Sequence, residues 1–249
     1  MGMKRVKTSI QRYWDWRSAT YGYDHDKSVG VARKWESILK ELVTDSPGKL
    51  ALDIGTGTGQ VAVYLARSGF RTTGIDISES MIRRARQHAL EHGLHIDFQP
   101  GDAERLEFKD NTFDVVVSRN LVWTLPCPDQ ALKEWRRVMK PGATLVVSDG
   151  AWMNYTWRRV HHLAFKVFRE KLRNGSVISA RFFVSYAGVQ RSLPFYEGIR
   201  FEEASALLHE AHFRDIRAYD TASFGLNPYR AETTKSITAP SFFIAYAKK

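Results

Sequence analysis

One stretch of the sequence decides the fold. Leu50 to Gln60 reads Leu-Ala-Leu-Asp-Ile-Gly-Thr-Gly-Thr-Gly-Gln, a short apolar run that ends in an acid and is followed by three glycines at alternate positions. The apolar run predicts a buried parallel strand. Each glycine lacks a Cβ and tolerates positive φ, so the glycines predict a turn whose backbone a ligand can touch. Because residues 61–67 have helical character, the stretch predicts the nucleotide-binding start of a doubly wound α/β domain.

Strands and helices alternate after this stretch, and a helix precedes it. An amphipathic helix is predicted before it, at Val29–Leu42, because apolar residues recur there at helical spacing. The regular alternation after it predicts a mainly parallel sheet with helices on both faces. The further strands are expected at 71–75, 95–99, 113–118, 143–148, 213–219 and 241–247, and helices at 60–68, from 78 onward, at 130–139 and at 201–211, with a turn at 141–142.

Acidic side chains follow the next two predicted strands. Asp76 ends the second strand, 23 positions after Asp53, which is close to the spacing of about 20 residues at which a second strand presents an acid to ribose hydroxyls. A carboxylate at this position accepts two hydroxyl hydrogen bonds and repels a 2′-phosphate. Ser78 is a candidate N-cap for the helix that follows. The third strand is followed by Gly-Asp-Ala at 101–103.

Length and composition predict one soluble domain. The 249 residues suit a single large domain, and 43 % apolar residues suffice for a full core. No apolar stretch approaches the roughly 18 residues that a membrane span needs, and the basic start has no apolar run behind it, so a secretory signal is not expected. One cysteine, Cys127, leaves no internal disulfide and fits a reducing compartment. A cytoplasmic protein is therefore expected.

The formal charge of +10 is compatible with several kinds of binding partner. A basic balance suits nucleic acid, a membrane surface or an acidic small molecule. It also suits a soluble enzyme with a solvated basic surface.

Aromatic residues gather before the glycine stretch. A helix over about residues 10–18 would bring Tyr13, Trp14 and Arg17 near one another. Such a segment can act as a lid that excludes water from a ligand, or it can pack on the core as an ordinary aromatic helix.

These motifs resemble those of the class I S-adenosylmethionine-dependent methyltransferases, in particular the small-molecule, ubiquinone-biosynthesis-like group. The resemblance runs from Leu50 to Asp149 and extends to the tail. It rests on the glycine turn, the acid of the second strand, Gly-Asp-Ala, and Phe-Asp-Val-Val-Val-Ser followed by Trp-Arg-Arg-Val-Met-Lys-Pro-Gly. It implies a Rossmann-like seven-stranded sheet with an antiparallel last strand, a helical cap, and S-adenosyl-L-methionine as cofactor.

The resemblance also implies which residues bind the cofactor. The glycine turn would hold the methionine moiety, Asp76 the ribose, and Asp102 with Ala103 the adenine; residues 118–123 would line cofactor and substrate. Arg17 of the N-terminal lid could pair with the cofactor carboxylate, because a guanidinium is a fork-shaped donor. The expected cofactor-binding residues are Tyr13, Arg17, Tyr21, Asp53, Gly55, Thr56, Gly57, Gly59, Asp76, Ile77, Met81, Asp102, Ala103, Asn120 and Leu121.

A nicotinamide enzyme is the rival interpretation of the glycine turn. Its fingerprint places the third glycine three positions after the second, whereas these glycines alternate and position 60 is Gln.

Methyl transfer from a sulfonium needs in-line positioning and dry surroundings more than a strong base. The candidate bases are His25, His161 and His162, each of which also suits a structural or exposed role. Cys127 lacks the flanking residues of a cytosine-methylating nucleophile, and no metal site is expected.

The methyl acceptor is expected to contact aromatic side chains. Candidate substrate-binding residues are Trp14, Trp123, Trp152 and Tyr196. Residues 150–199 mix aromatic and basic residues, and a helix over about 155–172 would form a specificity cap for a small, aromatic or acidic acceptor. Its basic face leaves an RNA or protein acceptor open, and a non-catalytic cofactor-binding protein is a third interpretation.

The resulting organisation is one methyltransferase domain in four parts. Residues 1–45 are expected to form a helical lid, 46–150 the cofactor-binding core, 151–200 the cap insertion and 201–249 the C-terminal part of the sheet. The sequence leaves monomer and homodimer open, as well as the acceptor atom.

Overall fold

The computed structural model describes residues 2–19, 21, 29–151, 189, 192–224 and 242–249. The helices are α1 (Met3–Ser18), α2 (Val29–Leu42), α3 (Gln60–Arg67), α4 (Glu79–Glu91), α5 (Pro128–Val138) and α8 (Phe201–Glu210). The strands are β1 (Leu50–Ile54), β2 (Arg71–Asp76), β3 (Asp97–Pro100), β4 (Phe113–Arg119), β5 (Met139–Gly150), β6 (Arg214–Ala218) and β7 (Phe242–Lys248). Short 3₁₀ turns cover Val122–Thr124 and Thr221–Phe224.

The strands form one seven-stranded sheet in the order β3-β2-β1-β4-β5-β7-β6. β7 pairs antiparallel with both β5 and β6, whereas the pairs among β1 to β5 are parallel. The predicted α/β fold with an antiparallel last strand is confirmed. The predicted cap helix, which belongs to residues 151–200, lies almost wholly outside the described residues.

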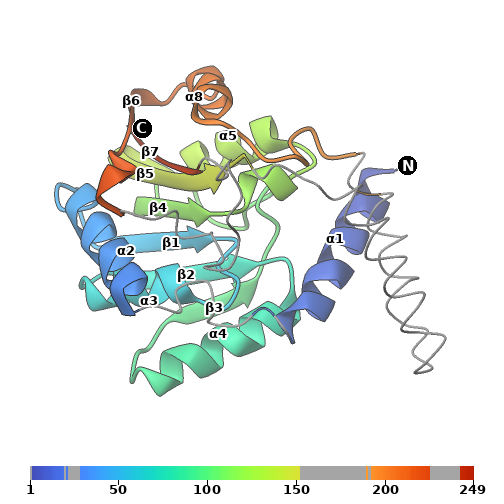
Figure 1. The fold of residues 1–249 in the computed structure, drawn as a ribbon, viewed down its shortest axis with the longest axis horizontal. Coiled ribbons are helices and arrows are strands. Elements are labelled where there is room, and N and C mark those ends of the chain that lie inside the picture. The colour runs from blue at the N-terminus through green and yellow to red at the C-terminus, as the bar shows by residue number, and fades with distance from the viewer. Residues whose placement is uncertain (1, 20, 22–28, 152–188, 190–191, 225–241) are drawn as a thin grey trace.

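Helices cover both faces of the sheet (Figure 1). Successive strand residues point to opposite faces, and the buried residues follow that alternation. Ala51, Val115 and Val117 pack against α2 and α3. Leu52, Ile54 and Val116 belong to the larger core on the side of α5 and α8.

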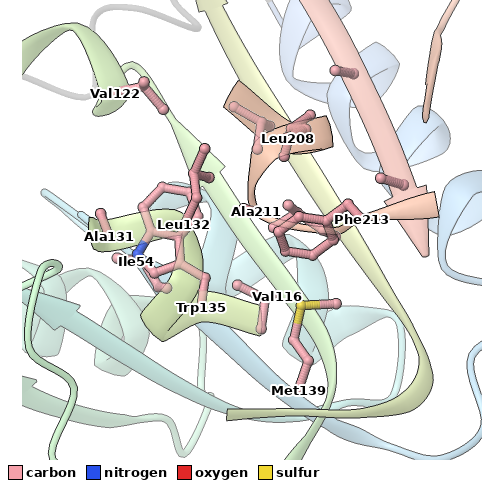
Figure 2. Close-up of a cluster of buried hydrophobic side chains, with 14 of the residues drawn as sticks. Ile54, Val116, Val122, Ala131, Leu132, Trp135, Met139, Leu208, Ala211 and Phe213 are labelled. Carbon is pink, nitrogen blue, oxygen red and sulfur yellow. The ribbon is translucent and has the colours of Figure 1, made fainter. Parts of the chain in front are cut away.

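The larger core contains Trp135, the aromatic residue of α5. Trp135 is 0 % exposed, and its Nε1 donates to the carbonyl oxygen of Ala103 at 2.9 Å. The ring therefore joins the core to the loop after β3. Figure 2 shows it among side chains from strands and helices that are distant in sequence, including Ile54, Val116, Val122, Ala131, Leu132, Met139, Leu208, Ala211 and Phe213.

The connections of β1 create a crevice at one edge of the sheet. β1 pairs with β2 on one side and with β4 on the other, so the chain winds outward in opposite directions from this point. Ligands of open α/β sheets bind beyond the carboxyl ends of the strands at such a switch point. In Figure 1 the arrowheads of β1 and β4 point toward the side on which α1 lies.

Two boundaries differ from those expected from the sequence. α1 begins at Met3, seven positions before the predicted start, and Val6 and Ile10 pack against Val189 and Leu193. The turn predicted at residues 141–142 lies inside β5, whose register against β4 shifts between Phe113 and Val115. The proline and glycine are thus accommodated by an irregularity of the strand and do not end it.

Candidate functional site

Asp53 holds the glycine turn in place from the side that faces away from the cleft. It is 1 % exposed at the end of β1, and its Oδ2 accepts hydrogen bonds from Thr56 Oγ1 at 2.5 Å and from the N–H of Ala62 at 3.1 Å. Burial raises the pKa of Asp53 to about 7, against the opposing effect of these two hydrogen bonds. Asp53 and Thr56 therefore shape the turn, and neither lines the cleft in front of it.

The turn presents backbone to that cleft at two glycines. Gly55 and Gly57 line the cleft with φ of +70° and +53°, a region that favours glycine. A Cβ on Gly55 would approach Leu121 to 2.9 Å. Gly59 lies away from the lining, where a Cβ would meet Ala85 and Phe98 at 3.0 Å, so its role is close packing of α3 against α4 and β3.

Asp76 is the acid at the carboxyl end of β2. Its Oδ2 accepts from the N–H of Gly57 and its Oδ1 from the N–H of Ser78, both at 2.9 Å. Each carboxylate oxygen has further lone pairs, and the side chain lines the cleft. Burial raises the pKa of Asp76 to about 6, although the two backbone hydrogen bonds favour the ionised form. The carboxylate is thus held in place with acceptor capacity left on each oxygen.

The cleft lies at the carboxyl ends of β1, β2 and β4 and is partly open to solvent. Its lining combines the glycine turn with side chains from α1, from the loops after β2 and β3, and from the segment after β4. The lining residues are Lys7, Ile10, Trp14, Tyr21, Gly55, Gly57, Ile75, Asp76, Ile77, Met81, Gly101, Asp102, Ala103, Glu104, Arg119, Asn120, Leu121, Thr124, Leu125 and Pro126.

A lysine from α1 bridges two acids after β3. Lys7 Nζ lies 2.6 Å from Asp102 Oδ2 and 2.6 Å from Glu104 Oε2. Burial lowers the pKa of Lys7, but the hydrogen bonds to the two carboxylates outweigh it and the pKa is raised. Asp102 also accepts from the N–H of Glu104 at 3.0 Å, and Glu104 from that of Cys127 at 2.6 Å. This end of the cleft is therefore polar and closed by the start of α1.

The other half of α1 is fastened to α4. Asp15 Oδ1 accepts from the hydroxyl of Ser78 at 2.6 Å and from the N–H of Ser80 at 3.2 Å. Ser78 caps α4 as predicted, since its hydroxyl accepts from the N–H of Met81 at 3.1 Å. Arg84 of α4 donates to the carbonyl oxygen of Ser18. Between these attachments Ile10 and Trp14 face the cleft, so α1 closes it from the side seen in Figure 1.

Asn120 follows β4 in an unusual backbone conformation. Its φ is +58°, which is uncommon for a residue with a side chain. Its N–H donates to Ser148 at 2.8 Å, and its carbonyl accepts from Trp123 Nε1 at 3.1 Å. Its buried Oδ1 has no hydrogen-bond partner among the described residues. A buried acceptor on a strained residue at the cleft is typical of a ligand-binding position.

The structure brings half of the predicted site residues together at the cleft. The cleft is lined by Tyr21, Gly55, Gly57, Asp76, Ile77, Met81, Asp102, Ala103, Asn120 and Leu121 of the expected cofactor set, and by Trp14 of the expected substrate set. Other predicted residues are described but lie outside the lining, namely Tyr13, Arg17, Asp53, Thr56, Gly59, Trp123 and Tyr196. The candidates His25, Trp152, His161 and His162 lie outside the described residues.

Two charged residues of the lining, Lys7 and Glu104, had no predicted role. Lys7 and Glu104 contact each other across a long sequence separation, which no local pattern reveals. Arg119 belongs to the segment that was expected to line the site, and its place at the end of a buried strand was the available signal.

The described residues contain no group of three or more His, Cys, Asp or Glu side chains arranged to hold a metal ion. In the same part of the chain, no helix combines the length and apolarity needed to cross a bilayer.

Residues 52–147 match the family model described as a methyltransferase domain. Among curated proteins, the ubiquinone/menaquinone biosynthesis C-methyltransferase of Ruegeria sp. (strain TM1040) is 36 % identical over 126 residues, which cover 49 % of this chain and 50 % of the relative. The chain thus spans about half the length of the curated relatives it matches.

Solved structures extend the likeness beyond the matched segment. A SAM dependent methyltransferase from Aquifex aeolicus aligns with a TM-score of 0.57 at 21 % identity, covering 86 % of this chain and 88 % of the other. Phosphoethanolamine N-methyltransferase 2 of Haemonchus contortus, in complex with S-adenosyl-L-methionine, gives 0.59 at 20 % identity, covering 87 % and 52 %. At these identities the likeness shows the fold. Residues 52–147 thus match a methyltransferase domain, and the chain has the fold of the S-adenosylmethionine-dependent methyltransferases among these solved structures.

Proposed function

We propose that this protein transfers the methyl group of S-adenosyl-L-methionine to a small-molecule acceptor. The observation that carries the proposal is Asp76, a carboxylate fixed by two backbone N–H groups at the edge of a cleft with a glycine floor. Two ribose hydroxyls can donate to such a group. The cleft lies at the switch point of the sheet, where nucleotides bind in this class of fold.

The residues present fit the cofactor along the length of the cleft. Asp102 and Ala103 are suited to the adenine end, Asp76 to the ribose, and Gly55 with Gly57 to the methionine end. A Cβ on Gly55 would narrow the space at Leu121, which is consistent with a backbone that must approach the ligand closely. The buried Oδ1 of Asn120 offers an acceptor to a donor on the cofactor or on the methyl acceptor.

Bound S-adenosylmethionine supplies an electrophilic methyl group on a sulfonium. The protein has to hold an acceptor in line with that methyl group and keep water away. Ile10, Trp14 and Leu125 give the cleft apolar walls, and the attachments of α1 to Asp102 and Ser78 keep this helix over the cleft. The chain's contribution is therefore positioning and desolvation, without a requirement for a strong base.

A planar aromatic acceptor fits these surroundings. Trp14 and Tyr21 line the cleft, and aromatic faces bind planar molecules. The named relatives act in ubiquinone and menaquinone biosynthesis, which agrees with a small acceptor. The basic cap face on which an RNA or protein acceptor would depend belongs to residues outside the described part of the chain.

Two measurements test this function. Calorimetry should detect binding of S-adenosylmethionine and of its demethylated product, and labelled cofactor should transfer methyl to quinone-precursor-like phenols or other small acceptors and leave bulk RNA unlabelled. Absence of cofactor binding would contradict the proposal. Labelling of RNA alone would favour a polymer acceptor, and binding without transfer to any acceptor class would favour a non-catalytic cofactor-binding protein.

The affinity for the cofactor should depend on pH through Asp76. Its folded-state pKa is raised to about 6, and ribose hydroxyls donate to the ionised form. The affinity should therefore be constant well above pH 6 and fall as the pH decreases through about 6, by at most roughly tenfold per pH unit. Calorimetry with S-adenosylhomocysteine between about pH 5 and pH 8 measures this.

Asp76→Asn is the control for that titration. It should bind more weakly and show no change near pH 6, because its amide does not titrate. Asp53, whose pKa is raised to about 7, remains in the variant. A fall that persists in Asp76→Asn would therefore be assigned to the buried acid behind the glycine turn, and the assignment to Asp76 would be wrong.

A further inference from the structure

Two opposite charges lie side by side at the β3 end of the cleft. Lys7 Nζ of α1 is 2.6 Å from Asp102 Oδ2, and both residues line the cleft. The side chain of Lys7 is 23 % exposed and that of Asp102 is 35 % exposed, whereas that of Glu104, the second partner of Lys7, is only 2 % exposed. Lys7 and Asp102 therefore form the accessible part of this group of charges, and Glu104 forms its buried part.

Both accessible members retain hydrogen-bonding capacity. An ammonium group has three N–H donors, and Lys7 uses two of them, on Asp102 Oδ2 and on Glu104 Oε2. Within the described part of the chain, no third acceptor contacts its nitrogen. Asp102 Oδ1 accepts from the N–H of Glu104 at 3.0 Å, and a carboxylate has about four acceptor positions on its two oxygens. The pair thus offers a ligand one donor and at least one acceptor.

The order of the strands places this pair where the base of the cofactor would lie. Asp76, the proposed ribose ligand, ends β2, and Asp102 follows β3, the next strand in the sheet. The glycine turn follows β1, on the other side of β2. With the ribose at Asp76 and the methionine moiety at the glycine turn, the base extends toward β3.

The edge of an adenine base is complementary to this pair. Its amino group donates, and the ring nitrogens on either side, N1 and N7, accept. A side-chain amide recognises such an edge with an oxygen and a nitrogen that lie close together. The 2.6 Å contact brings the acceptor Asp102 Oδ2 and the donor Lys7 Nζ similarly close. Hypoxanthine has a carbonyl oxygen in place of the amino group, so it would face Asp102 as acceptor against acceptor.

We propose that Lys7 and Asp102 recognise the adenine base together, with Asp102 accepting from the amino group and Lys7 donating to the ring nitrogen beside it, N1 or N7. This inference rests on the proposed function, because it assumes that the cleft holds S-adenosylmethionine. It makes Lys7 a specificity-determining residue that α1 contributes to the cofactor site. An ion pair that only fastens α1 to the loop after β3 would give the same contacts without the ligand, so the test has to depend on the base.

Analogues of S-adenosylhomocysteine that lack one ring nitrogen test the contact with Lys7. In the 1-deaza and 7-deaza analogues a C–H group replaces N1 or N7, and the amino group stays. The wild-type protein should bind one of the two about 10-fold or more weakly than S-adenosylhomocysteine, because a hydrogen bond from a charged donor is lost. S-inosylhomocysteine, which carries hypoxanthine, should bind at least as weakly. Calorimetry measures all of these affinities.

Lys7→Met removes the donor. It should weaken S-adenosylhomocysteine to about the affinity of the weaker deaza analogue, and these two ligands should then bind alike. Because the substitution leaves the buried carboxylate of Glu104 without its counter-charge, Lys7→Met/Glu104→Gln is measured beside it and should show the same equality. Lys4→Met removes an exposed lysine of α1 outside the lining and should change no affinity. Thermal unfolding shows whether each variant is folded.

Three results would overturn the inference. Equal binding of S-adenosylhomocysteine and both deaza analogues to the wild type would mean that neither ring nitrogen is contacted. A difference that persists unchanged in the Lys7 variants would mean that another donor contacts the ring. An equal loss for every ligand in those variants would mean that Lys7 only holds α1 in place. In each case binding of S-adenosylhomocysteine to the wild type leaves the proposed function intact, whereas a wild type that binds none of these ligands contradicts the proposed function itself.

Discussion

Asp76→Ala is expected to weaken binding of S-adenosylmethionine by roughly 100-fold or more. The carboxylate would accept two ribose hydroxyl hydrogen bonds, and hydrogen bonds to a charged group contribute about 1.5–3 kcal/mol each. The substitution also removes the acceptors for the N–H groups of Gly57 and Ser78, which hold the glycine turn and the start of α4 in place. Both losses lower the affinity for S-adenosylmethionine.

Asp76→Asn separates the loss of the ribose hydrogen bonds from the loss of the backbone hydrogen bonds only in part. An amide has one oxygen and one nitrogen, so its nitrogen would face the N–H of either Gly57 or Ser78 as donor against donor. We expect an affinity between those of the wild type and Asp76→Ala. Asp97→Ala removes an exposed acid from the neighbouring strand and is the matched control, with no expected effect.

Calorimetry with the cofactor and thermal unfolding of the same samples give the comparison. A folded Asp76→Ala variant that binds like the wild type would contradict the ribose assignment, and with it the direction in which the cofactor is laid along the sheet.

Local sequence was sufficient for the core of the fold. The glycine turn, the acid of β2 and the cap at Ser78 depend on residues that are close in the chain, and each has a physical reason that a pattern expresses. Short continuous apolar runs located β1 and β4 closely, since strands that are buried on both faces are apolar along most of their length.

The start of α1 could not be predicted for a different reason. Val6 and Ile10 are buried against Val189 and Leu193, which lie more than half the length of the chain away. Lys7 contacts Asp102 across 95 positions. No periodicity near residue 3 encodes these partners, so the basic start of the sequence was not assigned to the helix.

Position also decided which of two similar residues faces the cleft. Asp53 and Asp76 both end buried strands, yet only Asp76 lines the cleft, because Asp53 is turned behind the glycines toward Thr56 and Ala62. Of the two arginines, Arg119 lines the cleft and Arg17 does not. Spacing identifies the residue types a ligand needs, but the direction of a side chain depends on packing with distant elements.

Trp135→Ala should lower the free energy of unfolding by about 3–5 kcal/mol, the range for removing a large aromatic side chain from a core. Trp135 is 0 % exposed and belongs to the core between α5, α8 and the sheet (Figure 2). The substitution leaves a cavity among residues from five or more elements, which cannot all move to fill it. Chemical denaturation with comparison of the midpoint and the slope measures the loss.

Trp135→Phe tests the link between this core and the site. Phenylalanine keeps much of the apolar contact but removes the hydrogen bond from Nε1 to the carbonyl of Ala103, a residue of the cleft. A buried carbonyl without its donor costs about 1–3 kcal/mol, and the loop after β3 becomes free to shift. We therefore expect a smaller loss of stability than in Trp135→Ala, together with weaker binding of adenosine-containing ligands.

Lys133→Ala on the exposed side of α5 is the control and should change stability by less than about 0.5 kcal/mol. If Trp135→Ala lost no more than this control, the core between α5 and the sheet would contribute little to stability. If Trp135→Phe lost stability but bound 5′-methylthioadenosine as tightly as the wild type, the hydrogen bond to Ala103 would be a structural contact alone. A joint loss of stability and affinity would mean that the packing of α5 positions the adenine wall of the cleft.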